Sequence, residues 1–261
     1  EGVNPVVMTF LGASGPYPGS DDLPSILVSS GRKHILLDAG EGVQHRLLDA
    51  GRSVTSVTHV LITHLHGDHV LGLLPLIQSR SLGGAETPLT VAGPKGLKDF
   101  LLDSFKHLMF APSYELRVLE IGSRGELDLG GVKVAFEELI HSVPTVGYRL
   151  YFPGLSLCYV TDTRPSERAV KLCSGVDVLV HDAAFSCEDQ RIAEEYMHST
   201  VCEAAGIASE AEAKVLYLYH TSPRYRDPGF LLAQCRKVFK SCFLARKFMK
   251  VYLLPKMLKE I

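Results

Sequence analysis

One short stretch of the chain is unusually rich in side chains that bind metals. In THLHGDHVLGL, the residues His64, His66, Asp68 and His69 fall within six consecutive positions. Imidazole and carboxylate groups suit a borderline or hard divalent cation. Side chains two positions apart lie on the same side of an extended segment, so His64 and His66 are expected to face one ion. Gly67 permits a turn that directs Asp68 and His69 toward a second position.

The number of ligands in this hexapeptide predicts a dinuclear site. A single tetrahedral ion would not take four ligands from six residues and still leave a position for chemistry. Two ions about 3.5–4 Å apart are typical of hydrolytic two-metal sites. We therefore expect two metal positions close together.

Further residues of ligand type stand directly after apolar runs elsewhere in the chain. An isolated histidine at the end of a strand is usually structural, and an isolated aspartate usually caps the next helix or turn. Asp38 in ILLDAGEG has the same ordinary explanation. Together with the hexapeptide, however, these residues indicate convergence at one edge of a fold. They are His141 after VKVAFEELI, Asp162 in LCYVTD, His181 and Asp182 in VDVLVHD, and His220 in KVLYLYH.

The elements that position these residues are expected to be mostly buried strands with helices between them. Short apolar runs rich in β-branched residues predict the strands. These runs are VVMTFLG, SILVSSG, KHILLDAG, VTHVLITH, PLTVAG, GVKVAFEEL, GYRLYF, SLCYVTD, VDVLVHDAAF, KVLYLYH and FMKVYLL. Helices are expected over residues 42–50, 69–79, 94–105, 165–173, 188–212 with a break near Ser199, and 228–239. Two or three strands and then a helix, repeated in both halves, predict layers of helix, sheet, sheet and helix.

Composition predicts one soluble globular domain over residues 1–261. The chain is 46% apolar, and neither a linker nor an apolar run of about 20 residues is visible. A bilayer span and a signal peptide are therefore not expected. The six cysteines are widely spaced without a C-x-x-C pair, so we expect free, buried thiols in a reducing, cytoplasmic compartment.

The basic residues are unevenly distributed, although the net charge is only -2. Ten lysines and arginines follow Thr221, against Asp227 and Glu260. This asymmetry favours either a polyanionic partner or a solvated basic surface.

The hexapeptide HLHGDH resembles the signature of the metallo-β-lactamase superfamily, and its surroundings resemble the ribonuclease Z family of zinc-dependent tRNA 3′-processing endonucleases. The similarity runs in order through nearly the whole chain. It implies an α/β fold, the αββα four-layer sandwich of two mixed β-sheets flanked by helices, and a homodimer. The similar segments are FLGASG, LLDAGEGVQHRLL, THLHGDHVLGLLPLI, HSVPTVGYRL, VTDTRPSERAVKLCSGVDVLVHDAAF, HSTVCEAAGIASEA, LYHTSPRYRDP and FLARKFMKVYLL.

The resemblance also implies roles for individual residues. Two zinc ions per chain are implied, with Mn²⁺ or another divalent metal as an alternative. One ion would be held by His64, His66 and His141, the other by Asp68, His69 and His220, with Asp162 bridging. A metal-bridged hydroxide would attack phosphorus, and Asp68 could accept its proton.

A histidine outside the ligand set is implied as a second catalytic group. His198 in HST would donate a proton to the departing 3′-oxygen, or stabilise it, and Asp182 would orient its imidazole. The family is expected to carry glutamate at the position of Asp182, so the side chain here is one methylene shorter.

Two segments depart from the family pattern and concern the substrate. The long flexible arm that grips tRNA is missing, because only YFPGLSLCYV separates GYRL from TDTRP. The N-terminal loop that senses the tRNA 3′ end reads PYPGSDDLPS, with Asp21 and Asp22 where a cation would be useful.

Three functions therefore remain open. The first is a phosphodiesterase that removes the 3′ trailer of precursor tRNA, with the basic C-terminal segment replacing the arm. The second is an armless hydrolase of a small ester, lactone, sulfate or cyclic nucleotide. A non-catalytic RNA-binding subunit is the third, and the full ligand set argues against it.

Overall fold

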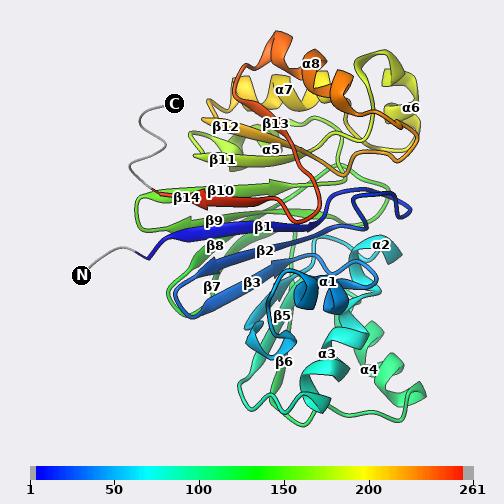
Figure 1. Cartoon of the computed structure of the whole chain (residues 1–261), viewed down its shortest axis with the longest axis vertical. Helices are drawn as coiled ribbons and strands as arrows, with labels where there is room; N and C mark the ends of the chain where they lie inside the picture. Colours follow the sequence, from blue (N-terminus) through cyan, green and yellow to red (C-terminus); the bar gives the residue numbers. More distant parts are fainter. Residues whose placement is uncertain (1–3, 255–261) are drawn as a thin grey trace.

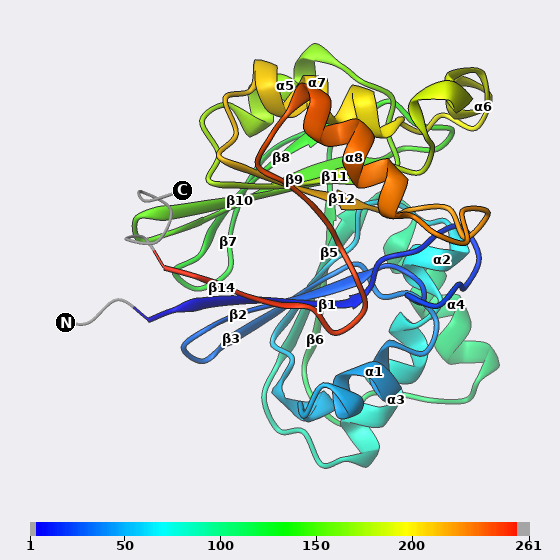
Figure 2. The ribbon, with the colours of Figure 1, turned by 45° about the horizontal axis from the view of Figure 1, so that its top comes forward.

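Two seven-stranded β-sheets face each other across an apolar core, with helices on both outer surfaces (Figure 1, Figure 2). The structure is a computed structural model and describes residues 4–254. The first sheet has the order β14-β1-β2-β3-β4-β5-β6, and the second has the order β13-β12-β11-β10-β9-β8-β7. Both sheets mix parallel and antiparallel pairs. The predicted four-layer α/β sandwich is confirmed.

The strands have the following bounds. The first sheet contains β1 (Val6–Gly12), β2 (Ser25–Ser30), β3 (Lys33–Leu37), β4 (His59–Leu61), β5 (Leu89–Pro94), β6 (Leu116–Ile121) and β14 (Lys250–Leu253). The second contains β7 (Arg124–Asp128), β8 (Lys133–Glu138), β9 (Val146–Phe152), β10 (Leu155–Val160), β11 (Val178–Asp182), β12 (Val215–Tyr219) and β13 (Cys242–Leu244).

Helices cover each sheet from outside. The first sheet packs against α1 (Val43–Asp49), α3 (Leu73–Leu82) and α4 (Leu97–His107), and the second against α5 (Glu167–Cys173), α7 (Val201–Glu210) and α8 (Gly229–Val238). Two further helices are shorter, α2 (Gly67–Val70) and α6 (Gln190–Glu195). Two 3₁₀ turns span Val54–Ser56 and Cys187–Asp189. Within residues 4–254, no helix has both the length and the apolar character needed to cross a bilayer.

The continuous apolar runs of the sequence follow from burial on both faces of a strand. In β3, Ile35 and Leu37 point into the core between the sheets, whereas Leu36 points to the helices outside. Strands covered on both sides do not alternate apolar with polar residues.

The sequence analysis did not predict three of the strands, β6, β7 and β13. In β6 and β7 most residues are exposed or only partly buried, so their apolar patterns are weak. The helix expected over residues 69–79 is interrupted at Gly72, where a Cβ would lie 2.0 Å from the carbonyl oxygen of Gly40. The break expected near Ser199 in the helix over 188–212 is confirmed, because α6 ends at Glu195 and α7 begins at Val201.

The expectation of six free cysteines was wrong for four of them. The structure has disulfides between Cys187 and Cys202 and between Cys235 and Cys242. Cys158 and Cys173 are free, buried and 2.9 Å apart at their sulfurs. Wide spacing in sequence did not separate the thiols, because the 3₁₀ turn at Cys187 packs against α7, which carries Cys202, and α8, which carries Cys235, packs against β13, which carries Cys242. Disulfides are typical of oxidising compartments and of intracellular hyperthermophile proteins, so cysteine usage no longer supports a reducing compartment.

Candidate metal centre

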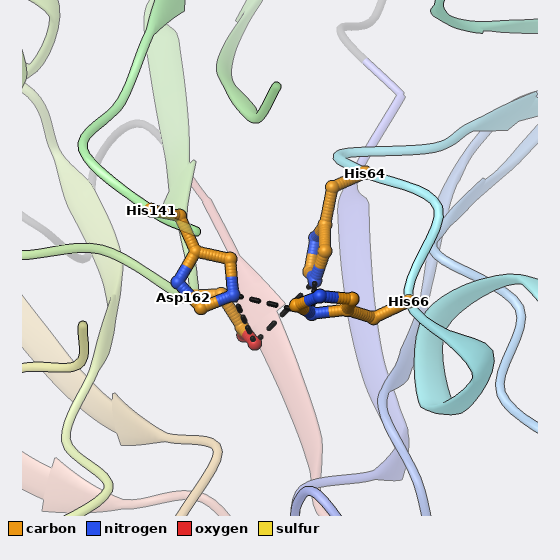
Figure 3. A group of neighbouring side chains, drawn as sticks. All are labelled: His64, His66, His141 and Asp162. Carbon is orange, nitrogen blue, oxygen red and sulfur yellow. Dashed lines mark hydrogen bonds and ion pairs between the residues drawn. The ribbon is translucent and has the colours of Figure 1, made fainter. Parts of the chain in front are cut away.

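The predicted ligands meet at one edge of the sandwich, and both sheets contribute them. His64 and His66 lie in the loop after β4, and His141 and Asp162 follow β8 and β10 of the other sheet (Figure 3). Asp68 and His69 lie in α2, and His220 follows β12.

The first group of converging side chains contains His64, His66, His141 and Asp162. Nδ1 of His66 lies 3.1 Å from Nε2 of His64 and 3.2 Å from Nε2 of His141. Oδ2 of Asp162 faces the same space, 3.5 Å from Nε2 of His64 (Figure 3).

The second group contains Asp68, His69, His220 and the same Asp162. Nε2 of His220 lies 3.1 Å from Oδ2 of Asp68 and 3.3 Å from Nε2 of His69. Oδ1 of Asp162 completes this group, 3.2 Å from Nε2 of His69. The two oxygens of Asp162 thus face different groups, which is the placement a bridging carboxylate needs.

Three of these histidines donate a hydrogen bond through Nδ1 to a residue outside the two groups. This bond places the proton on Nδ1 and leaves Nε2 unprotonated. Nδ1 of His69 donates to Oδ2 of Asp38 at 2.7 Å, and Nδ1 of His141 donates to the carbonyl oxygen of Met197 at 3.0 Å. Nδ1 of His64 donates to the hydroxyl of Thr63, which in turn donates to Asp38. With these nitrogens protonated, the inward nitrogens carry lone pairs, as metal-ligating histidines do.

This donor set fits divalent cations. Lone pairs and carboxylates that face each other at 3.1–3.5 Å repel unless positive charge lies between them. The same negative potential acts on His69, because burial lowers its pKa but Asp162, Asp38 and Asp68 outweigh that effect and raise the pKa well above the ordinary value. Imidazole and carboxylate ligands without thiolate suit zinc and similar borderline metals.

The backbone adopts a left-handed conformation at three of the site's residues. Asp38, Asp162 and His220 have φ values of 58°, 54° and 59° and stand just after β3, β10 and β12. Such values are uncommon in non-glycine residues and cluster at functional sites. Gly15 also approaches closely, since a Cβ there would lie 1.9 Å from Nε2 of His220.

Asp38 organises the site, although its place after an apolar run is also typical of an ordinary cap or turn residue. Its carboxylate accepts hydrogen bonds from the backbone nitrogen of Thr63 at 2.8 Å, from His69, and from the hydroxyl of Tyr159 at 2.8 Å. The residue is fully buried. Its position directly after a strand was the available signal, but its partners are 25 to 121 residues away.

His198 and Asp182 lie together beside the second group. Nδ1 of His198 is 2.9 Å from Oδ2 of Asp182, so the shorter carboxylate still reaches the imidazole. The ring of His198 stacks on that of His220, with centroids 5.1 Å apart. Burial opposes the charged form of His198, but Asp182 and Asp162 outweigh it and raise its pKa to about 9.

His181 does not join these groups, although it also stands near a strand end. It is fully buried, and its Nδ1 contacts the carbonyl oxygen of Asp182 at 2.8 Å.

The two departures from the family pattern have clear structural counterparts. Strands β9 and β10 form a hairpin joined by Pro153 and Gly154, where the arm was missing from the sequence. Asp21 and Asp22 form ion pairs with the C-terminal segment, Oδ2 of Asp21 with Arg246 at 3.3 Å and Oδ2 of Asp22 with Lys247 at 2.9 Å. Part of the basic segment is therefore neutralised within the chain.

Comparison with known proteins identifies the family. Residues 33–221 match the family model described as beta-lactamase superfamily domain. The ribonuclease Z of Metallosphaera sedula is 33% identical, and the similarity covers 90% of this chain and 94% of that protein. The ribonuclease Z of Ignicoccus hospitalis is also 33% identical, and the similarity covers 93% of this chain and 96% of that protein.

Solved structures agree with this relationship. The short form of human tRNase Z superposes with a TM-score of 0.82 at 26% identity, covering 94% of this chain and 98% of that one. The metallo-β-lactamase fold protein YhfI of Bacillus subtilis, at 21% identity, shares the fold with a TM-score of 0.84 and coverage of 96% and 100%. The chain belongs to the ribonuclease Z family within the β-lactamase superfamily and is a metal-dependent hydrolase of the endoribonuclease type.

Proposed function

We propose that this protein is a dinuclear zinc phosphodiesterase that removes the 3′ trailer of precursor tRNA. The observation that carries the proposal is the position of Asp162, whose two oxygens face two separate groups of imidazole nitrogens. In this assignment His64, His66 and His141 would hold one ion, Asp68, His69 and His220 would hold the other, and Asp162 would contribute an oxygen to each. When bound, two divalent ions supply Lewis acidity toward the phosphoryl oxygens and toward a water molecule.

Asp68 is the proposed acceptor for the proton of the attacking water. Burial raises its pKa, but His69 and His220 outweigh that effect and hold the pKa of Asp68 well below its ordinary value. Its carboxylate is therefore ionised at neutral pH, as both a cation ligand and a proton acceptor must be.

His198 is the proposed proton donor to the leaving oxygen. Asp182 accepts the hydrogen bond from Nδ1 and leaves Nε2 directed toward Asp162, 3.9 Å from its Oδ2. A ribose 3′-oxygen is a poor leaving group, so protonation by a positioned imidazole accelerates its departure.

Asp182 is itself held firmly as the positioning residue. Oδ2 also accepts from the backbone nitrogen of Thr163 at 2.9 Å, and Oδ1 accepts from that of Ala184 at 3.1 Å. With these bonds in place, the carboxylate presents a fixed acceptor to His198.

A homodimer is part of the proposal, because family resemblance supports it. Sedimentation equilibrium would give a mass near twice that of the 28.6 kDa chain.

One observation favours a second function. The β9–β10 hairpin leaves no arm to hold tRNA, so a hydrolase of a small ester, lactone, sulfate or cyclic nucleotide would need no further segment. The basic residues Arg224 and Arg226, in the loop that follows His220, favour the nucleic acid, since they form no ion pair within residues 4–254.

A comparison of the two substrates in separate assays tests the proposal. Zinc-loaded protein is incubated with a precursor tRNA bearing a 3′ trailer and, separately, with bis-p-nitrophenyl phosphate. Cleavage at the trailer junction with a higher kcat/KM than the small diester supports tRNA processing. Turnover of the small diester without cleavage of the precursor would favour the second function.

A further inference from the structure

A small cavity opens beside the metal centre, and the proposed function above assigns no ligand to it. Its volume is about 250 Å³, below the roughly 300–1,000 Å³ of pockets that enclose a drug-sized ligand. His198 and His220 form one side of it. The other lining residues are Gly15, Pro16, Ala184, Phe185, Tyr196 and Ser222. The cavity therefore has room for one ring system next to the reacting phosphate.

Two aromatic rings line the cavity beside His198, since the ring of Phe185 meets that of His198 edge-on with centroids 6.2 Å apart. The rings of Phe185 and Tyr196 are nearly parallel, with centroids 6.5 Å apart and an interplanar angle of 26°. Phe185 is almost fully buried, whereas Tyr196 is 60% exposed and also lines the cavity. An exposed aromatic ring beside a catalytic cavity is a surface on which a flat ligand can stack.

Positive charge lies next to these rings. The guanidinium carbon of Arg224 is 5.8 Å from the ring centre of Phe185, and the Arg224 side chain is exposed. An aromatic platform with a neighbouring guanidinium suits a ligand that joins a flat ring to a phosphate.

A continuous short segment ties the platform to the proposed chemistry. Tyr196, Met197 and His198 are consecutive: Tyr196 lines the cavity, the carbonyl oxygen of Met197 accepts the hydrogen bond of His141, and His198 faces Asp182. The backbone nitrogen of His198 is anchored on the carbonyl oxygen of Ala193 at 2.8 Å. Tyr196 and His198 are separated by one residue and line the same cavity, so a ring stacked on Tyr196 would lie beside the proposed proton donor.

We propose that this cavity is a nucleobase subsite, in which Tyr196 and Phe185 stack the base of a nucleotide adjoining the scissile phosphate. The inference rests on the proposed phosphodiesterase function and names the substrate class of that site. Apart from Ser222 and the two histidines, the lining offers few groups for reading base edges, so the subsite accepts all four bases with little preference.

Matched p-nitrophenyl phosphodiesters test the subsite. The p-nitrophenyl esters of thymidine 3′- and 5′-phosphate are compared with the corresponding esters of abasic deoxyribose phosphate, using zinc-loaded protein. The readout is the ratio of kcat/KM for the base-bearing ester to that for the abasic one. A lost stacking contact lowers this ratio by about 5- to 100-fold in Tyr196→Ala, mainly through KM, while Tyr196→Phe retains it.

A second exposed tyrosine provides the control. Tyr252 on β14 is 62% exposed and pairs with Val7, toward the far end of β1 from the site, so Tyr252→Ala should leave the ratio unchanged. Calorimetric titration with thymidine 5′-monophosphate and with deoxyribose 5-phosphate gives a readout without catalysis. Wild-type protein should bind the nucleotide more tightly, and Tyr196→Ala should remove the difference.

The outcomes separate the two claims. If wild type hydrolyses both esters with the same kcat/KM, or if Tyr196→Ala leaves the ratio unchanged, the base subsite is wrong and the phosphodiesterase proposal stands. If no phosphodiester is hydrolysed but the base-dependent binding is present and lost in Tyr196→Ala, the subsite stands and the proposed function is wrong.

Discussion

The carboxylate of Asp182 and the imidazole of His198 form a buried pair, with Oδ2 and Nδ1 2.9 Å apart. Asp182 is fully buried and held by backbone N–H groups, so the pair fixes the proton on Nδ1 and the direction of Nε2. Asp38 holds Nδ1 of the proposed ligand His69 in the same way, at 2.7 Å, so both imidazoles direct Nε2 toward Asp162.

Replacing His198 should slow RNA cleavage without removing metal. His198→Ala is expected to reduce cleavage of precursor tRNA by about 10²–10⁴-fold, because a ribose 3′-oxygen leaves poorly without a proton. Hydrolysis of bis-p-nitrophenyl phosphate should fall much less, since p-nitrophenolate leaves without one. Rates on both substrates and zinc content by elemental analysis are the measurements.

The exposed His107 at the end of α4 provides the control variant for this experiment, as His107→Ala. Equal loss on both substrates with zinc retained would assign His198 to phosphate positioning. Loss of zinc in His198→Ala would place the residue among the metal ligands instead.

The pKa of His198 offers a test on metal-free protein. Asp182 and Asp162 overcome the effect of burial and raise this pKa from 6.5 to about 9. With a raised folded-state pKa, the pair stabilises the fold fully below about pH 6.5, and this contribution is lost as pH rises through about 9. NMR titration of the His198 ring should show the raised value, and Asp182→Asn should lower it. A wild-type value at or below 6.5 would contradict the charged pair.

The metal assignment predicts about two divalent ions per chain. Asp162→Ala should disturb both ions together, because its Oδ1 and Oδ2 face different groups. His141→Ala should instead weaken one ion selectively, since it belongs to the first group alone. Elemental analysis after dialysis measures both effects, with Asp103→Ala on the exposed face of α4 as control. At most one ion in metal-replete wild type would rule out the dinuclear site.

The two disulfides predict distinct losses of stability. Cys187–Cys202 closes a loop with a sequence separation of 15, and Cys235–Cys242 one of 7. Loop-closure entropy gives about 3 kcal/mol for the longer loop and about 2 kcal/mol for the shorter. Denaturant unfolding of the double alanine variants should follow this order.

Activity separates these disulfides further. The longer loop contains Tyr196 and His198, so the Cys187→Ala/Cys202→Ala variant should also lose activity on RNA, whereas Cys235→Ala/Cys242→Ala should keep it. Alkylation of unreduced, denatured wild type should modify only Cys158 and Cys173. Six modified thiols would show that neither bridge forms.

Basic residues near the site should differ in their contribution to RNA binding. Arg246 and Lys247 are paired with Asp21 and Asp22, whereas Arg224 and Arg226 form no ion pair within residues 4–254. If Arg224 and Arg226 contact phosphates, Arg224→Gln/Arg226→Gln should make the slope of log K against log salt less steep, by about 0.7–0.9 per lost contact.

The matched variant Arg246→Gln/Lys247→Gln should change the slope less, because those charges are already neutralised. Filter binding of precursor tRNA at several salt concentrations measures both variants. Equal slopes in wild type and the Arg224→Gln/Arg226→Gln variant would assign these arginines to solvated surface.

Features encoded over short distances could be predicted from the amino-acid sequence. The hexapeptide around His66 predicted a metal site, because ligand-type residues at nearby positions can be recognised without the tertiary structure. Continuous apolar runs predicted strands buried on both faces, and resemblance to a family supplied the layers and the ligand set. Strands β6 and β7 were missed because their exposure leaves no strong apolar pattern.

Tertiary structure alone decided the contacts between distant segments. The division of the Asp162 oxygens between two groups, and the hydrogen bonds of Asp38 to His69 and Tyr159, depend on how the two sheets face each other. The same holds for the disulfide between Cys187 and Cys202. Local periodicity records only which face of an element is buried, whereas these pairings depend on the register of elements that are far apart in the chain.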